Sequence, residues 1–215
     1  MAEVHILTYN PFQENTIVIE SGGEFIVIDP GAYTGDEQTH FLDFLDNLAS
    51  VPKRLLNTHC HLDHIFSNGL VKEKFGLDLE IHPLESELLK AAPMVGKTYG
   101  IPTEASPEPG KWLQEGDYIE FGDEQLKILF TPGHSPGSVS FYSEKGKYLI
   151  GGDVLFYESI GRADLPGGDF QTLMESIKTE LLSLEDDVRV YPGHGPVTTI
   201  GHERLHNPFI RQYGL

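Results

Sequence analysis

Cysteine, positive charge and long apolar runs are all scarce in this sequence. Its 215 residues include one cysteine, Cys60, so an internal disulfide is impossible and a reducing compartment is favoured. No stretch approaches the roughly 18 apolar residues of a membrane span. Lys and Arg number 15 against 33 Asp and Glu, and the formal charge of -18 would repel a phosphate backbone. We therefore expect neither a membrane nor a nucleic-acid partner.

The beginning of the chain carries no recognisable export signal. Met1-Ala2-Glu3-Val4-His5 contains no basic region followed by an apolar core, so we expect a cytoplasmic protein. The 39% of hydrophobic residues is enough for one sizeable core, and no linker or low-complexity segment divides the chain. The sequence predicts a single domain over residues 1–215.

Strand and helix patterns alternate along the chain. Apolar alternation and turn signals predict short strands at residues 4–9, 15–20, 24–29, 53–57, 79–82, 118–121, 125–131, 139–143, 148–152 and 188–191. Helical spacing predicts helices at 36–50, 65–75, 85–91 and 169–184, and the Pro- and Gly-rich stretch 92–110 is predicted to be irregular. Two strand-rich halves that each close with helices indicate an α/β protein with two packed sheets and helices outside.

One short stretch concentrates side chains that bind metals. The segment Thr58-His59-Cys60-His61-Leu62-Asp63-His64 places three imidazoles and a carboxylate directly after a predicted strand. These are ligands that Zn²⁺ prefers and that Fe and Mn accept. Residues i and i+2 of an extended segment face the same way, so His59 and His61 can share one ion. Cys60 then faces the opposite side, and we expect it to be buried and unreactive.

Three later positions place His or Asp after a predicted strand in a Gly-rich turn. They are His134 in Thr131-Pro132-Gly133-His134, Asp153 in Gly151-Gly152-Asp153 and His194 in Tyr191-Pro192-Gly193-His194-Gly195. A single Pro-Gly-His would indicate only a turn. Glycine lets the backbone turn sharply and approach an ion closely, so the three turns together predict further ligands.

With these motifs the chain resembles a metallo-β-lactamase-fold hydrolase, and within that superfamily the glyoxalase II-like, or hydroxyacylglutathione hydrolase-like, branch. Compact single-domain bacterial members share three segments, which are Gly161-Arg162-Ala163-Asp164-Leu165-Pro166-Gly167-Gly168-Asp169, Gly195-Pro196-Val197-Thr198-Thr199-Ile200-Gly201-His202-Glu203 and Asn207-Pro208-Phe209. The resemblance implies a four-layer αβ/βα sandwich, with two mixed sheets and helices on their outer faces. It also implies two divalent metal ions, with Zn²⁺ expected and Fe or Mn as alternatives.

By the same resemblance, seven residues would bind these ions. The first ion would take His59, His61 and His134, the second Asp63, His64 and His194, and Asp153 would bridge the two. Asp63 would also be catalytic, because it would orient a metal-bound hydroxide for attack on a carbonyl. The substrate implied is a small thioester such as S-2-hydroxyacylglutathione, whose thiolate leaving group needs little protonation.

Other functions remain open at this level. A persulfide dioxygenase of this branch would use a single iron on His59, His134 and Asp153, and a lactonase or other ester hydrolase would share the fold. A non-catalytic metal-binding module would close its site with protein ligands, whereas seven ligands on two ions leave room for water. The two-domain enzymes of this branch contact glutathione through a C-terminal helical domain, and we expect no such domain here. Arg162 either pairs with Asp164 or holds a substrate carboxylate in a bidentate fork.

Overall fold

The computed structural model describes residues 2–214, so Met1 and Leu215, the ends of the predicted domain, lie outside the described residues. The chain forms two compact units. Unit 1 is the chain up to Leu113 together with Glu120–Glu124, and unit 2 is Gln114–Ile119 together with the chain from Gln125 onward. Among the described residues, no helix has both the length and the apolar character needed to cross a membrane.

Unit 1 contains a mixed sheet of six strands. In spatial order they are β1 (Glu3–Tyr9), β2 (Glu14–Ser21), β3 (Glu24–Ile28), β4 (Val51–Leu56), β5 (Leu79–Ile81) and β6 (Pro109–Trp112). The first three strands pair antiparallel, and the pairs from β3 to β6 are parallel. The five predicted strands of this region are confirmed to within two residues, whereas β6 was not predicted.

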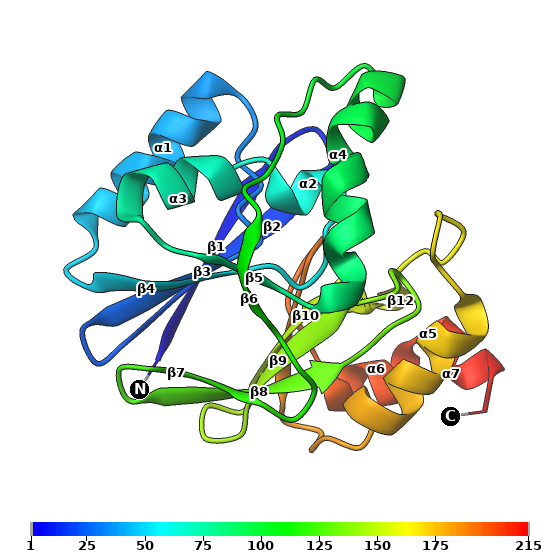
Figure 1. Ribbon diagram of the computed structural model, residues 1–215. Coiled ribbons are helices and arrows are strands. Elements are labelled where there is room, and N and C mark those ends of the chain that lie inside the picture. Colours follow the sequence, from blue (N-terminus) through cyan, green and yellow to red (C-terminus); the bar gives the residue numbers. More distant parts are fainter. Residues whose placement is uncertain (1, 215) are drawn as a thin grey trace. The chain divides into compact units, whose positions relative to one another are not determined.

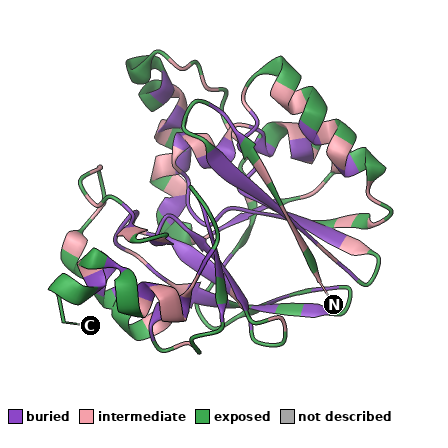
Figure 2. Cartoon of the chain, turned by 180° about the vertical axis from the view of Figure 1, so that it is seen from behind, coloured by how far each residue is buried: buried purple, intermediate pink, exposed green. Residues whose placement is uncertain are grey.

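Helices cover one face of this sheet (Figure 1). They are α1 (Gly35–Asn47), α2 (Leu62–Ile65), α3 (Asn68–Phe75), the 3₁₀ turn η1 (Pro83–Glu85) and α4 (Ser86–Tyr99). Phe41 of α1 and Val71 of α3 are fully buried in one cluster with Val27 and Leu55 of the sheet. Burying such side chains contributes roughly 1.5–3 kcal/mol each, which holds the β4 end in a fixed place. Figure 2 shows the central strands as buried and the outer helix faces as exposed.

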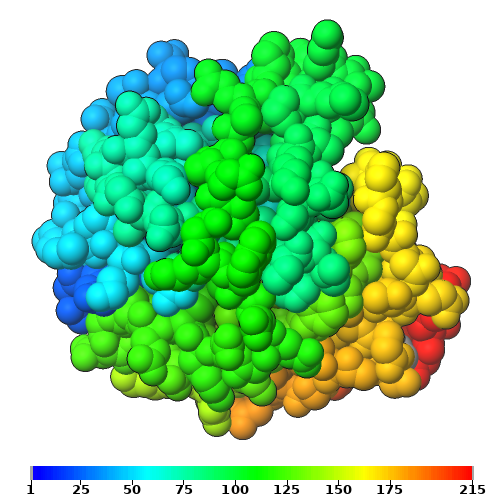
Figure 3. Space-filling view, in the orientation of Figure 1, coloured from blue at the N-terminus to red at the C-terminus, as the bar shows by residue number. Residues whose placement is uncertain are grey.

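Two helix predictions in unit 1 need correction. The helix predicted at 65–75 is two helices, because the Ser67 backbone N–H donates to Pro30 O at 2.8 Å and its hydroxyl donates to Ala32 O, which interrupts the ladder. The helix predicted at 85–91 continues to Tyr99, so the prediction of irregular structure was wrong for 92–99. The chain then runs back over the surface between α3 and α4 to reach β6 (Figure 3).

The second sheet is also mixed and belongs largely to unit 2. Its spatial order is β14 (Thr198–Thr199), β13 (Arg189–Pro192), β10 (Tyr148–Gly152), β9 (Val139–Ser143), β8 (Glu124–Phe130) and β7 (Tyr118–Phe121). β10 and β13 are parallel, while β9 pairs antiparallel with β8 and β10, so β8, β10 and β13 all end at one edge. A separate hairpin joins β11 (Leu155–Phe156) to β12 (Ser159–Ile160).

The helices of unit 2 pack on this sheet through a second core. They are α5 (Phe170–Ser176), the π-helical turn η2 (Ile177–Leu181), α6 (Ile200–His206) and α7 (Pro208–Gln212). Leu173 and Ile177 are buried with Leu149 and Val190 of the sheet. The predicted helix at 169–184 is therefore present, with a change to π geometry at Ile177. The predicted α/β class with two mixed sheets and helices is confirmed.

Candidate metal centre

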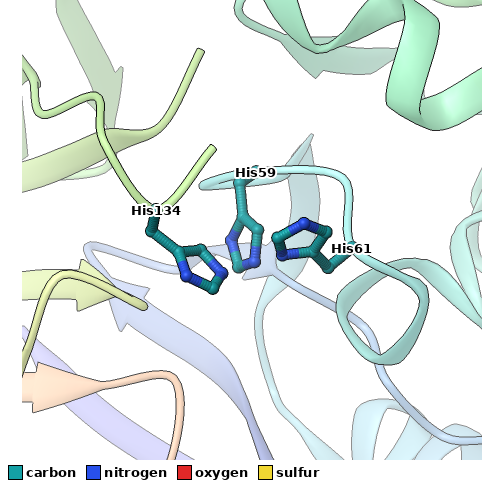
Figure 4. Close-up of side chains that lie close together, drawn as sticks. All are labelled: His59, His61 and His134. Atoms are coloured by element: carbon teal, nitrogen blue, oxygen red, sulfur yellow. The ribbon is translucent and has the colours of Figure 1, made fainter. Parts of the chain in front are cut away.

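The His-rich segment begins immediately after β4 and is held by Asp29 at the end of the neighbouring strand β3. The Asp29 carboxylate accepts hydrogen bonds from the Thr58 N–H at 2.7 Å and the Thr58 hydroxyl at 2.6 Å. The rings of His59 and His61 lie close together, with centroids 4.9 Å apart (Figure 4). Cys60 points away from them into the core of unit 1, where it is 2% exposed, as predicted.

The Nδ1 atoms of two histidines in this segment are fixed by neighbours. His59 Nδ1 lies 3.0 Å from Thr58 Oγ1, and His64 Nδ1 lies 3.1 Å from Asp29 Oδ2. A carboxylate that accepts from one ring nitrogen holds the imidazole in the tautomer whose other nitrogen can bind a metal. Sequence reasoning missed this role, because Asp29 was interpreted only as the last residue of the strand predicted at 24–29. Asp29 adopts a φ of 52°, which is uncommon for a residue other than glycine.

Asp63 and His64 lie on α2, where the chain leaves the extended segment. Asp63 Oδ2 is 3.7 Å from His64 Nε2, so the two side chains offer their ligand atoms to the same place. The backbone at Asp63 is held by Asn10, whose amide donates to Asp63 O at 3.0 Å and to Gly31 O at 2.9 Å. This part of unit 1 therefore holds its ligands through several separate hydrogen bonds.

A second carboxyl group, Glu14, is completely buried beside His64. Its Oε1 lies 4.0 Å from His64 Nδ1, and its Oε2 accepts from the Thr16 hydroxyl at 3.0 Å. Burial raises the pKa of Glu14 well above its ordinary value, and the nearby His64 opposes that shift. Nothing in the sequence pattern indicated this residue, since a Glu at the start of a strand is usually exposed.

In unit 2, the candidate ligands lie at the strand edge defined above. His134, labelled in Figure 4, follows β8. Its Nδ1–H donates to Arg162 O at 2.7 Å. Gly133 adopts a φ of 126°, and a Cβ there would lie 2.2 Å from Leu173 N, so this turn requires glycine. Asp153 follows β10. The loop after β13 is fixed to the end of β10 by the Gly193 N–H, which donates to Gly152 O at 2.8 Å.

Asp153 occupies the central position among the ligands of unit 2. Its Oδ2 lies 3.4 Å from His134 Nε2 and 3.5 Å from His194 Nε2. One carboxylate oxygen and two imidazole nitrogens, which are ligand types that Zn²⁺, Fe and Mn accept, therefore lie close together. The donor set in each unit, imidazole nitrogen with carboxylate oxygen, fits Zn²⁺, Fe or Mn.

Four of the seven predicted ligands, His59, His61, Asp63 and His64, lie in unit 1, and the other three, His134, Asp153 and His194, lie in unit 2. His59, His64 and His134 are buried, Asp153 is almost buried, and His61, Asp63 and His194 are half-buried. The chain thus carries a His/Asp cluster able to hold metal ions. Arg162, the predicted substrate contact, forms a bidentate pair with Asp164, at 2.7 Å from Nε and 2.9 Å from the second nitrogen. Its role in binding a substrate carboxylate stays a prediction.

Comparison with known proteins agrees with this architecture. The sequence pattern of the metallo-beta-lactamase superfamily matches residues 9–194. The hydroxyacylglutathione hydrolase GloC of Haemophilus influenzae is 35% identical, and the alignment covers 96% of this chain and 97% of that protein. The crystal structure of TTHA1623 in a di-iron-bound form has a TM-score of 0.86, 38% identity, and coverage of 96% and 100%. The crystal structure of BLEG-1 B3 metallo-beta-lactamase has a TM-score of 0.88, 35% identity, and coverage of 98% and 99%.

Proposed function

We propose, from the premise that this chain belongs to the metallo-β-lactamase superfamily and is a metallo-hydrolase, that it hydrolyses thioesters of the S-2-hydroxyacylglutathione class. The observation that carries the proposal is the position of Asp153 Oδ2 between the Nε2 atoms of His134 and His194. Such a carboxylate suits a pair of ions at one site. Two ions about 3.5–4 Å apart are typical of hydrolytic sites, because both can act on one reacting group.

The proposed ligand sets follow the sequence expectation. His59, His61 and His134 would hold the first ion, Asp63, His64 and His194 would hold the second, and Asp153 would be a ligand of both. Within unit 1, the support is the proximity of the His59 and His61 rings and of the Asp63 and His64 ligand atoms. Within unit 2, it is the position of Asp153. Zn²⁺ stays the predicted metal, and the di-iron form of TTHA1623 makes iron the first alternative to test.

The residues of the chain have separate tasks in this proposal. When bound, the ions lower the pKa of a water molecule to about 7 and polarise the substrate carbonyl. Asp63 would accept a hydrogen bond from a water molecule in the site and so orient it for attack on the carbonyl carbon. Asp29 and the Arg162 carbonyl keep His64 and His134 in the tautomers that present Nε2. The thiolate that leaves is stable near neutral pH, so no strong general acid is required of the chain.

Similarity to GloC supports the choice of substrate class. The alignment covers 97% of that hydroxyacylglutathione hydrolase, so the relative carries almost nothing beyond the part that matches this chain. In our proposal the glutathione part of the substrate contacts this compact fold, and Arg162 is our candidate for one of its carboxylates.

Hydrolysis of a β-lactam is the second candidate, because BLEG-1, a B3 metallo-beta-lactamase, is 35% identical over nearly its whole length. An amide in a strained ring and a thioester both react by attack on a carbonyl, so the same ligands could serve either reaction. Measured turnover of a thioester and of a β-lactam distinguishes the two candidate functions.

A turnover panel tests the proposal. Metal-free protein is reloaded with Zn²⁺, Fe²⁺ or Mn²⁺ and assayed with S-lactoylglutathione, a small lactone, nitrocefin and glutathione persulfide, the last with oxygen uptake recorded. We expect S-lactoylglutathione to give the highest kcat/KM, and His134→Ala to lower that kcat/KM at least about a hundredfold. His206→Ala, at an exposed histidine outside both ligand sets, is the matched control. No thioester hydrolysis with any metal, together with turnover of nitrocefin or persulfide, would reject the proposal.

A further inference from the structure

Two completely buried polar residues, Glu203 and Asn207, take no part in the proposed chemistry. Glu203 lies in α6 and Asn207 caps the start of α7. They belong to segments 195–203 and 207–209, which resemble those of compact hydrolases and which we call together the C-terminal motif. A buried carboxylate is costly unless hydrogen bonds compensate for lost hydration. The groups that donate hydrogen bonds to the Glu203 carboxylate therefore indicate which segments this residue holds together.

Glu203 connects two segments that are distant in the sequence. Its Oε1 accepts from the Thr198 hydroxyl at 2.5 Å, and its Oε2 accepts from the backbone N–H of Glu158 at 2.9 Å. The Asn207 amide donates to Glu203 Oε2 at 2.8 Å and to Ser159 O at 2.9 Å. Glu158 adopts a φ of 52°, a strained conformation that persists only where surrounding contacts hold it. The carboxylate thus fixes β14 and the tip of the β11–β12 hairpin to one helix.

Both of these segments border His194. Thr198, the first residue of β14, lies four residues after His194 in the sequence. The hairpin carries Phe156, whose ring meets the His194 ring edge-on at a centroid distance of 6.1 Å. The His194 side chain is 25% exposed, compared with 3% for His134, so less of the protein interior restrains it. The contacts that fix the ring of a partly exposed ligand therefore help to determine its orientation.

We infer that Glu203, assisted by Asn207, is a positioning residue that fixes the His194 imidazole toward Asp153 and thereby sets the affinity of the second metal ion. Glu203 acts through the Phe156 ring on one side and through the Thr198 end of the loop on the other. The inference rests on the ligand sets of the proposed function, and it concerns metal binding alone. It assigns a role to the C-terminal motif that neither catalysis nor the ligand count requires.

Stepwise titration of metal-free protein with Co²⁺, followed by visible absorption, tests this inference without any substrate. Glu203→Ala should weaken one of the two Co²⁺ equivalents about ten- to a hundredfold and leave the other within about twofold. Glu203→Gln should recover part of the loss, because its amide oxygen can still accept from the Glu158 N–H. A general loss of stability would not separate the two equivalents in this way.

Two further variants protect the experiment against misfolding. Arg204→Ala is the matched control, since it removes hydrogen bonds to Asp186, Leu182 O and Leu184 O from the same helix, and it should leave both equivalents unchanged. Phe156→Leu removes the ring contact without leaving a buried polar group unpaired, and it should reproduce the selective weakening if Glu203→Ala does not fold.

The outcomes separate this inference from the proposed function. Selective weakening of one Co²⁺ equivalent, in a protein that hydrolyses no thioester, would support the positioning role of Glu203 and reject the proposed thioester substrate. Equal weakening of both equivalents, no weakening in either Glu203→Ala or Phe156→Leu, or a wild-type protein that binds only one Co²⁺, would overturn the inference.

Discussion

Replacing Asp29 by Asn should impair metal binding while preserving shape. Asp29 Oδ1 accepts from the Thr58 N–H at 2.7 Å and from the Asn57 amide at 3.3 Å, and both of these groups only donate. The oxygen of the new amide must therefore take the Oδ1 position, which places its NH₂ group where Oδ2 faced His64 Nδ1. That NH₂ group donates to Nδ1, so the ring proton moves to Nε2, the atom needed for the metal.

The size of the effect follows from these contacts. Two charge-assisted hydrogen bonds, from the Thr58 hydroxyl and from His64, become neutral ones, and bonds to a charged group contribute about 1.5–3 kcal/mol against about 1 for neutral bonds. We expect the free energy of unfolding of the metal-free protein to fall by about 1–3 kcal/mol. Loss of the partner that orients a ligand typically costs ten- to a hundredfold in metal affinity, which is about 1.4–2.8 kcal/mol.

Competition with a chelator measures this loss, and thermal unfolding of the metal-free protein measures the stability. Asp169→Asn is the matched control, because it removes the same charge at an exposed helix cap, where Asn and Asp are equally good acceptors for the Thr172 N–H. Asp29→Asn that retains wild-type affinity for two ions, or that differs in no respect from Asp169→Asn, would refute the tautomer argument.

Three further predictions test separate statements. Cys60→Ala should keep full activity and lose about 1 kcal/mol of stability, and the wild-type thiol should resist aromatic disulfide reagents until the protein unfolds, because burial raises the pKa of Cys60. Arg162→Ala should raise KM for S-lactoylglutathione about tenfold at unchanged kcat. Asp164→Ala should change neither constant, since the exposed ion pair of Arg162 with Asp164 contributes at most about 1 kcal/mol. Equal kinetics in the two variants would show that Arg162 does not bind the substrate. Arg54→Ala should cost about 3–5 kcal/mol in urea unfolding by leaving Glu80, 2% exposed, without its bidentate partner, and a loss below about 1 kcal/mol would mean that Lys111 replaces it.

The candidate site was largely predictable, because its residues sit where strand patterns end. The strands β4, β8, β10 and β13 each finish within four residues of a predicted ligand, namely His59, His134, Asp153 and His194. Strand patterns and Gly-rich turns are local in sequence, so they can be detected without knowledge of the fold. The i, i+2 argument that separated His59 and His61 from Cys60 is local in the same sense.

The residues that hold the ligands were not predictable in this way. Asp29 and Thr58 are far apart in sequence and meet only because β3 and β4 are parallel neighbours. Glu203 reaches Glu158 across 45 residues, and nothing in the motif indicated this contact. Sequence patterns report local geometry, whereas hydrogen bonds that fix a ligand depend on tertiary contacts.

The extent of α4 was missed for a different reason. Pro93, Gly96 and Gly100 suggested loop structure, although Leu89, Ala92 and Gly96 are all buried at helical spacing. Gly96 allows close packing, since a Cβ there would lie 2.4 Å from the Thr103 hydroxyl, and Gly100 is a left-handed C-cap. Gly96 thus lies within the helix and Gly100 ends it. Because both were interpreted as helix breakers, the apolar face of α4 was not recognised.

The central claim is that seven residues bind two ions at one centre, and anomalous diffraction from metal-loaded crystals tests it most directly. We predict two anomalous peaks roughly 3.5–4 Å apart. One peak should contact His59, His61 and His134, the other should contact Asp63, His64 and His194, and Asp153 should lie between them. A single peak in fully loaded crystals, or two peaks that do not share Asp153, would contradict the account.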